Sequence, residues 1–390
     1  MPVNAAIPLG LAWTSPFARW GGSLAEVSSL DVAEAVTRRA LADRGLDIAE
    51  VDELMLGWTV PQRDIFYGAP TLAARLGAQQ VSGPMLSQAC ATSVALLRAA
   101  AGSVLTGAAT TVLAVAADRT SNGPLLVYPQ PSAPAGAPAT ELWVLDSFAR
   151  DPQTQQSMLA TAEAVAAEQA VSRAELDDLT ALRHEQYAVA GGTGDHVVPV
   201  VIPGRRGDLV LDADEGVRHS TRDELGALRS AAKDGLHTFG SQTHPADGAA
   251  GAVVTTLERA RELSAGQGVV ELLGFGTSRV EAARMPKAPV PAALRALQAA
   301  GLQLADIELV TTHNPFAVND VYFSRETGFP LDRMNVRGCS LVFGHPQGPT
   351  GLRSVAELIT SLRERGGGIG LFTGCAAGDS GAAVVLHVHD

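Results

Sequence analysis

Cysteine, aromatic residues and charge are all scarce in this sequence of 390 residues. Its three cysteines cannot all pair, and a chain of this length does not need disulfides to fold, so we expect free thiols. An aromatic share of 5% argues against a β-sandwich filled by rings. The 40 glycines and the wealth of alanine favour closely packed small-residue helices and turns instead. We therefore predict an α/β fold.

Positive charge and long apolar runs are scarce as well. The net charge of −12 argues against a nucleic-acid partner, because phosphate binding needs a basic surface. No apolar run approaches the roughly 20 residues that span a bilayer. Residues 1–4 lack the basic start and apolar core of a signal peptide. We predict a cytoplasmic protein that has neither nucleic acid nor membrane as a partner.

The sequence contains an internal repeat. RALADRGLDIAEV at residues 39–51 matches RALQAAGLQLADI at residues 295–307, each a helical pattern that leads into a buried strand. DGAAGAVV at residues 247–254 resembles DSGAAVV at residues 379–385, each a turn followed by a strand of small and β-branched residues. Two matches in the same order favour a duplicated fold over chance similarity in an alanine-rich chain.

A segment of different character separates the two halves. Residues 120–243 begin with the proline-rich stretch PLLVYPQPSAPAGAPA and contain most of the charged clusters, and residues 154–190 have helical periodicity. Such an insertion is a suitable place for a substrate lid. We predict one half from residues 1–119 plus 244–265, the inserted loop domain at 120–243, and the second half at 266–390.

Cys90 is the first candidate for chemistry. It lies in MLSQACATS, residues 85–93, where a short predicted strand gives way to a helix. Unpaired N–H groups and the helix dipole at a helix N-terminus favour a thiolate, so we expect a lowered pKa and a nucleophilic sulfur. The alternative is a buried, inert thiol.

Two further candidates lie at predicted strand ends. His345 is in the loop GHPQGPTG, between a predicted strand at residues 339–343 and a helix, where it could accept the thiol proton of Cys90. Cys375 is in FTGCAAGDSG, where small neighbours leave room for a substrate. His345 could instead only satisfy backbone groups of its loop, and Cys375 could be a packed, inert thiol. However, Cys90, His345 and Cys375 all lie where a predicted strand ends in a loop.

These motifs together resemble the thiolase superfamily, the acetyl-CoA acyltransferases and 3-ketoacyl-CoA thiolases. CATS, GHPQGPTG and GCAAGDSGAA occur in the order and approximate spacing of that family, and residues 157–163, 172–177 and 212–219 of the insertion are similar too. The resemblance covers nearly the whole chain. It implies the duplicated α/β thiolase fold, two similar βαβαβαββ halves layered α-β-α-β-α, with an inserted loop domain over a coenzyme A site.

The resemblance also implies a reaction. Cys90 would carry an acyl group during thiolytic cleavage of a 3-ketoacyl-CoA or the reverse Claisen condensation of acyl-CoA. His345 would activate Cys90, and Cys375 would act as acid in cleavage or as base in condensation. The N–H groups of Cys90 and Ala377 would bind the acyl oxygen, and His345 with a water near His313 would bind the second oxyanion.

Further expectations follow from the same resemblance. Contacts with coenzyme A would come from Arg218, Met158, Thr243 and His244, with Arg205 and Arg206 as further candidates. The alternative for these arginines is that they are solvated loop charges. Coenzyme A would be substrate or product, with no permanently bound cofactor and no metal. The protein would serve fatty acid metabolism as a homodimer or homotetramer.

Three departures from the family pattern bear on the substrate. His313 replaces the asparagine of many members, as in the sterol-carrier-linked branch. Asp379 adds bulk and charge to a run where many members have glycines. FGSQTH, residues 239–244, stands where a Thr-Ala-Gly-Asn segment is common. Acyl chain length, physiological direction and pathway therefore stay open.

Two other readings of the same residues are considered. A ketosynthase-like condensing enzyme with a carrier-protein substrate would use Cys90, His313 and His345. Cys375 argues against it, because ketosynthases have no catalytic thiol there. A catalytically silent acyl-CoA or subunit binder would explain the altered glycine run, but the three reactive residues are all present.

Overall fold

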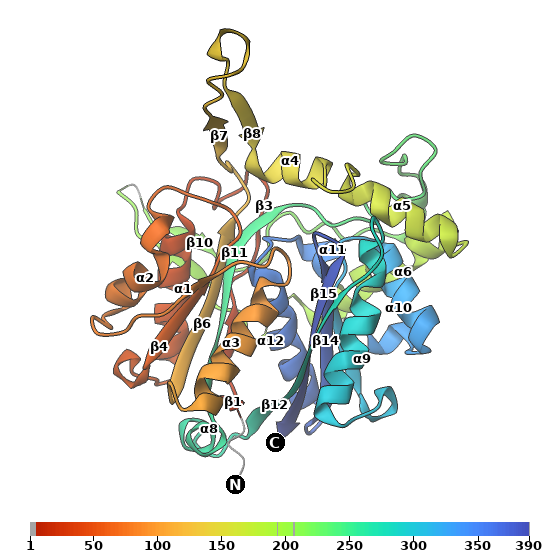
Figure 1. Cartoon of the computed structure of the whole chain (residues 1–390). Coiled ribbons are helices and arrows are strands. Elements are labelled where there is room, and N and C mark those ends of the chain that lie inside the picture. Colours follow the sequence, from red (N-terminus) through yellow and green to blue (C-terminus); the bar gives the residue numbers. More distant parts are fainter. Residues whose placement is uncertain (1–4, 193, 206, 390) are drawn as a thin grey trace.

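The computed structural model describes residues 5–192, 194–205 and 207–389. Its centre is an 11-stranded sheet (Figure 1). One half of this sheet runs inward from its edge as β5 (Met85–Leu86), β4 (Glu53–Gly57), β6 (Thr111–Arg119), β11 (Ala246–Thr256) and β1 (Ala5–Pro8). The other half runs inward as β13 (Leu309–His313), β14 (Gly368–Ala376), β15 (Ser380–His389) and β12 (Val269–Arg279). β2 (Ala12–Thr14) and β3 (Ala18–Arg19) pair with β11.

The two halves repeat one pairing pattern. β4 is parallel to β6 and β13 is parallel to β14, and the following pairs, β6–β11 and β14–β15, are antiparallel. β1 pairs with β12 through Ile7 and Val270, so the halves are joined edge to edge and do not form two separate sheets. The predicted duplicated α/β fold is confirmed.

Helices form three layers around this sheet. α1 (Ser29–Asp43) and α2 (Gly68–Leu76) cover the outer face of the first half, and α9 (Pro289–Ala300) and α10 (Ala317–Thr327) cover that of the second (Figure 1). α3 (Thr92–Thr106) and α12 (Pro349–Arg363) lie between the halves. α8 (Leu257–Leu263) follows β11 and packs against β1.

Alternation along the strands explains the layering. In β6, Val112 and Ala114 pack with α3 and α12, whereas Leu113 and Val115 pack with α1 and α2. Successive side chains of a strand point to opposite faces, so a strand covered on both faces is apolar throughout. This is why the buried strands read as continuous apolar runs.

The repeated sequence motif forms the same local structure twice. α1 continues through the 3₁₀ turn Ile48–Glu50 into β4, and α9 continues through the 3₁₀ turn Leu304–Asp306 into β13. The matching glycines Gly45 and Gly301 have φ of 68° and 69°, a left-handed conformation that ends a helix without the strain of a Cβ. Further 3₁₀ turns are Ile65–Tyr67, Pro134–Gly136, Met285–Lys287 and Leu331–Arg333.

The 18 residues 89–106 are the one helical stretch, among the described residues, that is long and apolar enough to cross a membrane. No membrane-length run was expected from the sequence. Half of this stretch is buried, and its helix, α3, packs against α12, β6 and β11. A helix enclosed between two sheet halves must be apolar on more than one face, which accounts for its composition.

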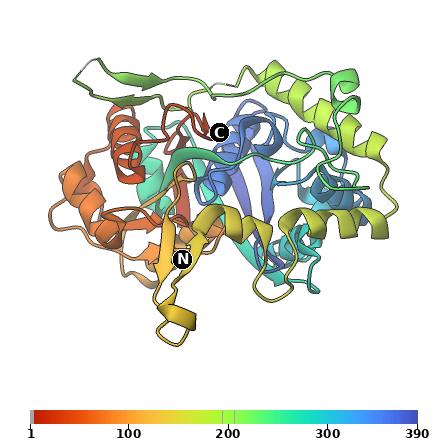
Figure 2. The ribbon, with the colours of Figure 1, turned by 90° about the horizontal axis from the view of Figure 1, so that it is seen from above.

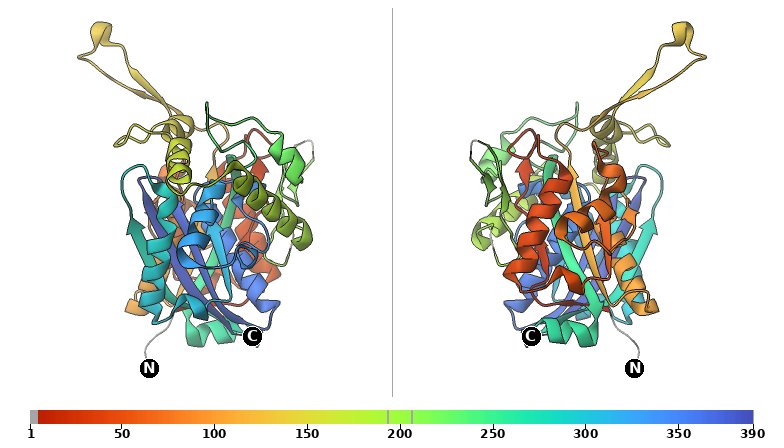
Figure 3. Two further views of the ribbon diagram at one scale, coloured as in Figure 1. Left: turned by 90° about the vertical axis from the view of Figure 1, so that its right-hand side faces the viewer. Right: turned by 90° about the vertical axis from the view of Figure 1, so that its left-hand side faces the viewer.

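The inserted segment lies between β6 and β11. Its elements are β7 (Leu125–Tyr128), β8 (Ala139–Leu142), α4 (Trp143–Ala149), α5 (Met158–Glu168), α6 (Arg173–Ala190), β9 (Val200–Ile202), β10 (Leu209–Leu211) and α7 (Arg222–Gly226). The β7–β8 hairpin extends away from the body in both side views (Figure 3). Seen from above, α4 and α5 lie along one side of the sheet ends, and β9 and β10 lie along the opposite side (Figure 2).

Two local predictions need correction. The helical pattern at residues 154–190 is two helices, separated by Ala170 with φ of 47°, because Ser172 starts α6 with a capping box that includes Glu175. The strand predicted at residues 339–343 is instead the short buried helix α11 (Ser340–Phe343). Periodicity does not distinguish a strand from a helix in so short an apolar run.

Candidate active site

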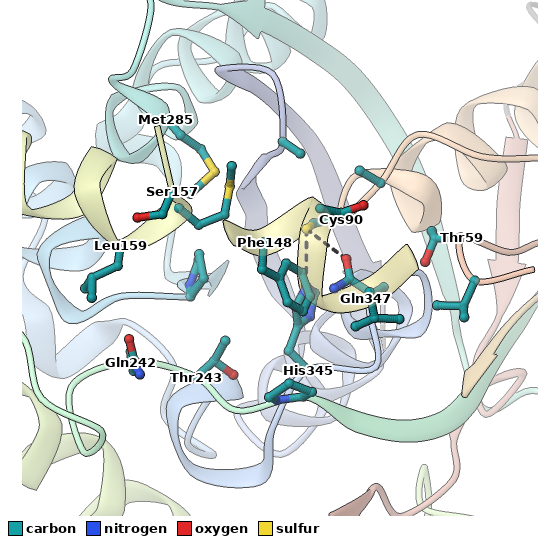
Figure 4. Close-up of a pocket in the computed structure, with 18 of the residues that line it drawn as sticks. Thr59, Cys90, Phe148, Ser157, Leu159, Gln242, Thr243, Met285, His345 and Gln347 are labelled. Atoms are coloured by element: carbon teal, nitrogen blue, oxygen red, sulfur yellow. Dashed lines mark hydrogen bonds between the residues drawn. The ribbon is translucent and has the colours of Figure 1, made fainter. Parts of the chain in front are cut away.

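A cavity of about 440 Å³ lies between the core and the inserted segment (Figure 4). Its floor includes Cys90, His345, Gln347 and Ala377. Its walls come from the insertion and from core loops and comprise Thr59, Val60, Ser87, Ala89, Trp143, Val144, Ser147, Phe148, Ser157, Met158, Leu159, Gln242, Thr243, Pro245, Met285, Pro315 and Phe316. The cavity therefore joins polar groups of the core to apolar and aromatic walls.

Cys90 and His345 meet on this floor although they are 255 residues apart. The Cys90 sulfur lies 3.2 Å from Nε2 of His345 (Figure 4). Nδ1 of His345 lies 2.6 Å from the Thr350 hydroxyl at the start of α12. When that hydroxyl accepts a hydrogen bond from Nδ1–H, the Nε2 lone pair faces the thiol. The pair has the geometry of a nucleophile beside its base.

The electrostatics of this pair differ from the sequence-based expectation. Burial raises the pKa of the Cys90 thiol to about 12, and the backbone N–H groups of Ala377 and Cys90 offset only part of that rise. The lowered pKa expected from the helix N-terminus is therefore wrong, because desolvation outweighs those dipoles. Burial and, secondly, His313 lower the pKa of His345 well below its ordinary value. The resting pair is a neutral thiol beside a neutral imidazole.

The predicted oxyanion donors lie beside the sulfur. The backbone N–H groups of Ala377 and Cys90 both interact with Sγ of Cys90. An acyl group on that sulfur would place its carbonyl oxygen near the same donors. The arrangement suits stabilisation of a tetrahedral oxyanion, and the assignment of these two groups stays a prediction.

Cys375 lies near the end of β14, outside the residues that line the cavity. Its side chain is buried, and its sulfur accepts a hydrogen bond of 3.3 Å from Nδ2 of Asn319 in α10. Burial raises the pKa of Cys375, and nearby Cys90 adds to the rise. The structure thus brings the two predicted thiols together.

His313, at the end of β13, is stacked on His345. The ring centroids are 4.0 Å apart with an interplanar angle of 25°. Burial lowers the pKa of His313 to about 3, and its Nε2 has no hydrogen-bond partner among the described residues. Among the described residues, Cys90 and these two histidines have ligand atoms within 4.8 Å of one another, the spacing of a group that could hold a metal ion. Stacked rings cannot both hold one ion in their planes, so this geometry favours proton transfer.

Asp118, which the sequence analysis missed, holds the His345 loop in place. This buried carboxylate accepts the N–H groups of Thr59 (2.8 Å), Val60 (3.0 Å) and Gly348 (2.9 Å), and the Thr59 hydroxyl (2.9 Å). Burial raises the pKa of Asp118 to about 7 against these four hydrogen bonds, which lower it. A single aspartate at a strand end has no local sequence pattern that marks such a role.

We expect Asp118→Asn to reduce both stability and turnover. The amide would turn its NH₂ toward the N–H of Gly348, leaving that buried donor unpaired at a cost of about 1–3 kcal/mol. Urea unfolding and kcat would measure the loss. Asp247→Asn is the matched control, since Oδ2 of the buried Asp247 has no partner in the described structure. Equal losses in both variants would contradict the role assigned to the Gly348 contact.

The predicted coenzyme A contacts separate into two groups. Met158 and Thr243 line the cavity, and the carbonyl of His244 accepts the N–H of His345 at 2.9 Å. Arg218 lies outside the cavity lining, with 81% of its side chain exposed and an ion pair of 3.3 Å to Glu224. Arg205 is exposed, and Arg206 lies outside the described residues. The contacts with coenzyme A stay predictions.

Asp379 does not fill the cavity, contrary to the expectation of added bulk and charge. Its carboxylate accepts the backbone N–H groups of Ala283 and Arg284, each at 2.9 Å. Asp379 therefore fixes the turn that leads to Met285, a residue of the cavity wall. The sequence pattern did not show this, because the turn lies 95 residues away.

Comparisons with known proteins agree with the predicted family. Residues 11–258 match the thiolase N-terminal domain and residues 267–388 match the thiolase C-terminal domain. The acetyl-CoA acetyltransferase of Escherichia coli K12 is 32% identical over 381 residues, and the β-ketothiolase of Cupriavidus necator is 30% identical over 381 residues. Each alignment covers 94% of this chain and 95% of the relative.

Solved structures agree as well. The Bacillus anthracis acetyl-CoA acetyltransferase superposes with a TM-score of 0.91 at 27% identity, over 99% of both chains. Human mitochondrial 3-ketoacyl-CoA thiolase in complex with CoA superposes with a TM-score of 0.91 at 25% identity, over 100% of this chain and 98% of that one. These matches do not favour a ketosynthase-like enzyme or a silent binder. Matched in both halves, the chain belongs to the thiolase family and is a thiolase-type acyltransferase.

Proposed function

We propose that this acyltransferase acts on acyl-CoA and 3-ketoacyl-CoA thioesters, with Cys90 as the acyl carrier. The observation that supports this proposal most directly is the 3.2 Å contact between the Cys90 sulfur and Nε2 of His345 on the cavity floor. The relative solved with CoA, at a TM-score of 0.91, supports this class of substrate. Residues 120–243 would serve as the lid domain, because they supply Trp143, Phe148 and Met158 to the cavity wall.

The first half of the reaction follows from this geometry. His345 takes the thiol proton, and the sulfur attacks the carbonyl carbon of the thioester or the 3-keto group. The N–H groups of Cys90 and Ala377 stabilise the oxyanion. Collapse of the tetrahedral intermediate expels the thiolate of coenzyme A or the enolate of acetyl-CoA, which takes up a proton. Acyl-Cys90 remains.

The second half of the reaction differs between thiolysis and condensation. In thiolysis, the thiol of coenzyme A loses its proton and attacks acyl-Cys90, which releases acyl-CoA and regenerates the thiol. In condensation, Cys375 removes a proton from the α-carbon of acetyl-CoA, and the carbanion attacks the carbonyl carbon of acyl-Cys90. The C–S bond breaks, 3-ketoacyl-CoA is released, and the Cys90 thiolate takes up a proton. The buried stack of His313 on His345 limits positive charge on the histidines, which favours their use as neutral groups near the second oxyanion.

The cavity walls support an apolar acyl group. Phe148, Leu159, Met285 and Phe316 line a space of about 440 Å³ that must also hold part of the coenzyme. An apolar acyl chain is consistent with the expected role in fatty acid metabolism. Intact-mass spectrometry after incubation with acyl-CoA and 3-ketoacyl-CoA thioesters of graded chain length tests this. Absence of an adduct with every thioester would overturn the proposed substrate class.

Cys375→Ala is expected to separate acylation from turnover. Cys90 still forms the acyl adduct, whereas thiolysis and condensation fall by about 10²–10⁴-fold, because the acid or base toward the α-carbon is missing. Intact-mass spectrometry and steady-state rates measure the two steps. Cys339→Ala is the matched control, since Cys339 is equally buried but touches neither Cys90 nor the cavity. Full turnover by Cys375→Ala would show that another group moves the proton.

We also propose a cytoplasmic homodimer or homotetramer. Three free cysteines suit a reducing compartment. Self-association is supported by the exposed Leu125, Val127 and Tyr128 on the β7–β8 hairpin that stands away from the body (Figure 3). Light scattering of the purified protein measures the oligomeric state, and a monomer would contradict this part of the proposal.

A further inference from the structure

Gln347 is the second side chain in contact with the proposed nucleophile. Its Oε1 lies 3.4 Å from the sulfur of Cys90, on the cavity floor beside His345 (Figure 4). Only 7% of the residue is exposed. The single S–H proton therefore faces two acceptors, the imidazole and the amide oxygen.

The backbone of Gln347 is held in an unusual conformation. Its φ is 66°, a left-handed value that residues other than glycine adopt only at a cost in conformational free energy. Hydrogen bonds fix the backbone after it, because the N–H of Gly348 binds Asp118 and the N–H of Thr350 binds the carbonyl of Gln347. The amide is thus directed at the sulfur by a loop that the core keeps in place.

The surroundings of the sulfur give a thiolate little support. The titratable groups that face Cys90 are His345, Cys375 and Asp118, and His313 lies behind His345. Asp118 opposes negative charge on the sulfur, and burial opposes positive charge on His345. Apart from His345, the donors in reach among the described residues are two backbone N–H groups. A further donor would stabilise the thiolate.

The Gln347 amide can provide that donor by rotation. Its oxygen accepts from the neutral thiol, and after proton loss the same oxygen would repel the thiolate. A half-turn about the last side-chain torsion presents the NH₂ group to the sulfur instead. Within the described chain Nε2 makes no hydrogen bond to protein, so the rotation breaks only the contact with the thiol.

We propose that Gln347 is a catalytic residue that holds the Cys90 thiol through its amide oxygen and stabilises the thiolate through its NH₂ group. The amide thereby follows the protonation state of the sulfur. This inference rests on Cys90 as the nucleophile of the proposed function. It goes beyond the Cys90, His345 and Cys375 chemistry, because the sequence analysis assigned no role to Gln347 although this residue stands in the GHPQGPTG motif.

Gln347→Leu tests the donor, because it removes both ends of the amide with little change in volume. Iodoacetamide alkylates the thiolate and needs no thioester, so its rate reports on the sulfur alone. We expect the rate constant for Cys90 at pH 8 to fall about 10- to 100-fold, as expected for loss of one hydrogen bond to a charged group. The pH profile of alkylation should move upward by about one to two units.

Gln347→Glu and Gln347→Met extend the test. An ionised glutamate accepts but cannot donate, so its rate should fall at least as far as that of the leucine variant. The methionine variant keeps the length of the side chain and gives the same readout if the leucine variant does not fold. Gln80→Leu is the matched control, because Gln80 is exposed and lies outside the cavity lining. Its alkylation profile should equal that of the parent.

The outcomes are separable. Parent-like alkylation in the Leu, Glu and Met variants would overturn the proposal, as would a change confined to the KM for the thioester, which would assign Gln347 to substrate binding. Failure of the parent itself to react at Cys90, as located by peptide mass spectrometry, would overturn Cys90 as the nucleophile. Failure to react with thioesters alone would concern only the substrate class.

Discussion

Cys90→Ala is expected to abolish the acyl adduct and to lower turnover by roughly four orders of magnitude or more, the scale seen when a covalent nucleophile is removed. The alanine leaves His345 without a thiol to deprotonate at 3.2 Å. Cys339 and Cys375 are not expected to substitute, because in the described structure neither sulfur is hydrogen-bonded to a histidine base. Intact-mass spectrometry after incubation with a reactive thioester, together with steady-state rates, measures both effects.

Controls make this result specific. Cys90→Ala removes only one small side chain, so its melting temperature should stay near that of the parent. Cys339→Ala should keep the adduct, because Cys339 is not among the residues that line the cavity. An adduct that persists in Cys90→Ala would show that another residue carries the acyl group, and peptide mapping would identify it.

Arg353→Met is expected to lower the free energy of unfolding by about 3–5 kcal/mol, the largest effect on stability that we predict. The guanidinium forms two hydrogen bonds to Asp214, of 2.6 and 2.7 Å, and a third of 3.0 Å to Glu357. It also lies 3.5 Å from the centroid of the Phe343 ring. Removing this cation leaves two carboxylates uncompensated in the interior.

The position of this ion pair explains why the loss should be global. Arg353 belongs to α12, between the sheet halves, whereas Asp214 belongs to the inserted segment and also accepts the N–H of Phe17 and the hydroxyl of Tyr187. The pair therefore ties the insertion to the core. Urea unfolding measures the effect, and Asp214→Leu combined with Arg353→Met should recover part of it by removing both charges.

Arg218→Met is the surface counterpart. Its ion pair with Glu224 is exposed, and exposed pairs contribute little to stability because water and salt screen them. The urea midpoint should not change measurably. An Arg353→Met variant that unfolds at the same midpoint as the parent would show that the buried pair is no more stabilising than this exposed one.

Local sequence patterns were sufficient for much of the fold. The helix–turn–strand repeat at residues 39–51 and 295–307 correctly predicted two similar halves, because apolar periodicity and the glycines that end each helix are encoded locally. The run at residues 339–343 was misassigned, because a short apolar segment suits a strand or a helix equally. The packing around this segment determined that it forms the short helix α11.

The candidate site, like the fold, was predictable from the sequence only in part. Motifs around Cys90, His345 and Cys375 were visible because each combines a reactive side chain with a distinctive run of small residues. The pKa of Cys90 was predicted in the wrong direction, since the helix position is local but desolvation depends on everything packed around the sulfur. Gln347 stood in a recognised motif, yet its contact with the sulfur depends on a left-handed backbone and the hold of Asp118 on Gly348.

The sequence by itself determined the α/β class, the duplication and the thiolase resemblance, and it supplied the candidate reactive residues, because these depend on periodicity, turn chemistry and short motifs within one stretch of chain. Tertiary structure decided the joining of the halves through β1 and β12, the neutral state of the Cys90 and His345 pair, and the walls of the cavity. Those properties arise from contacts between residues far apart in the chain, 263 positions for Ile7 and Val270 and 257 for Cys90 and Gln347. Burial and hydrogen bonding across such distances are set only when the whole chain has packed.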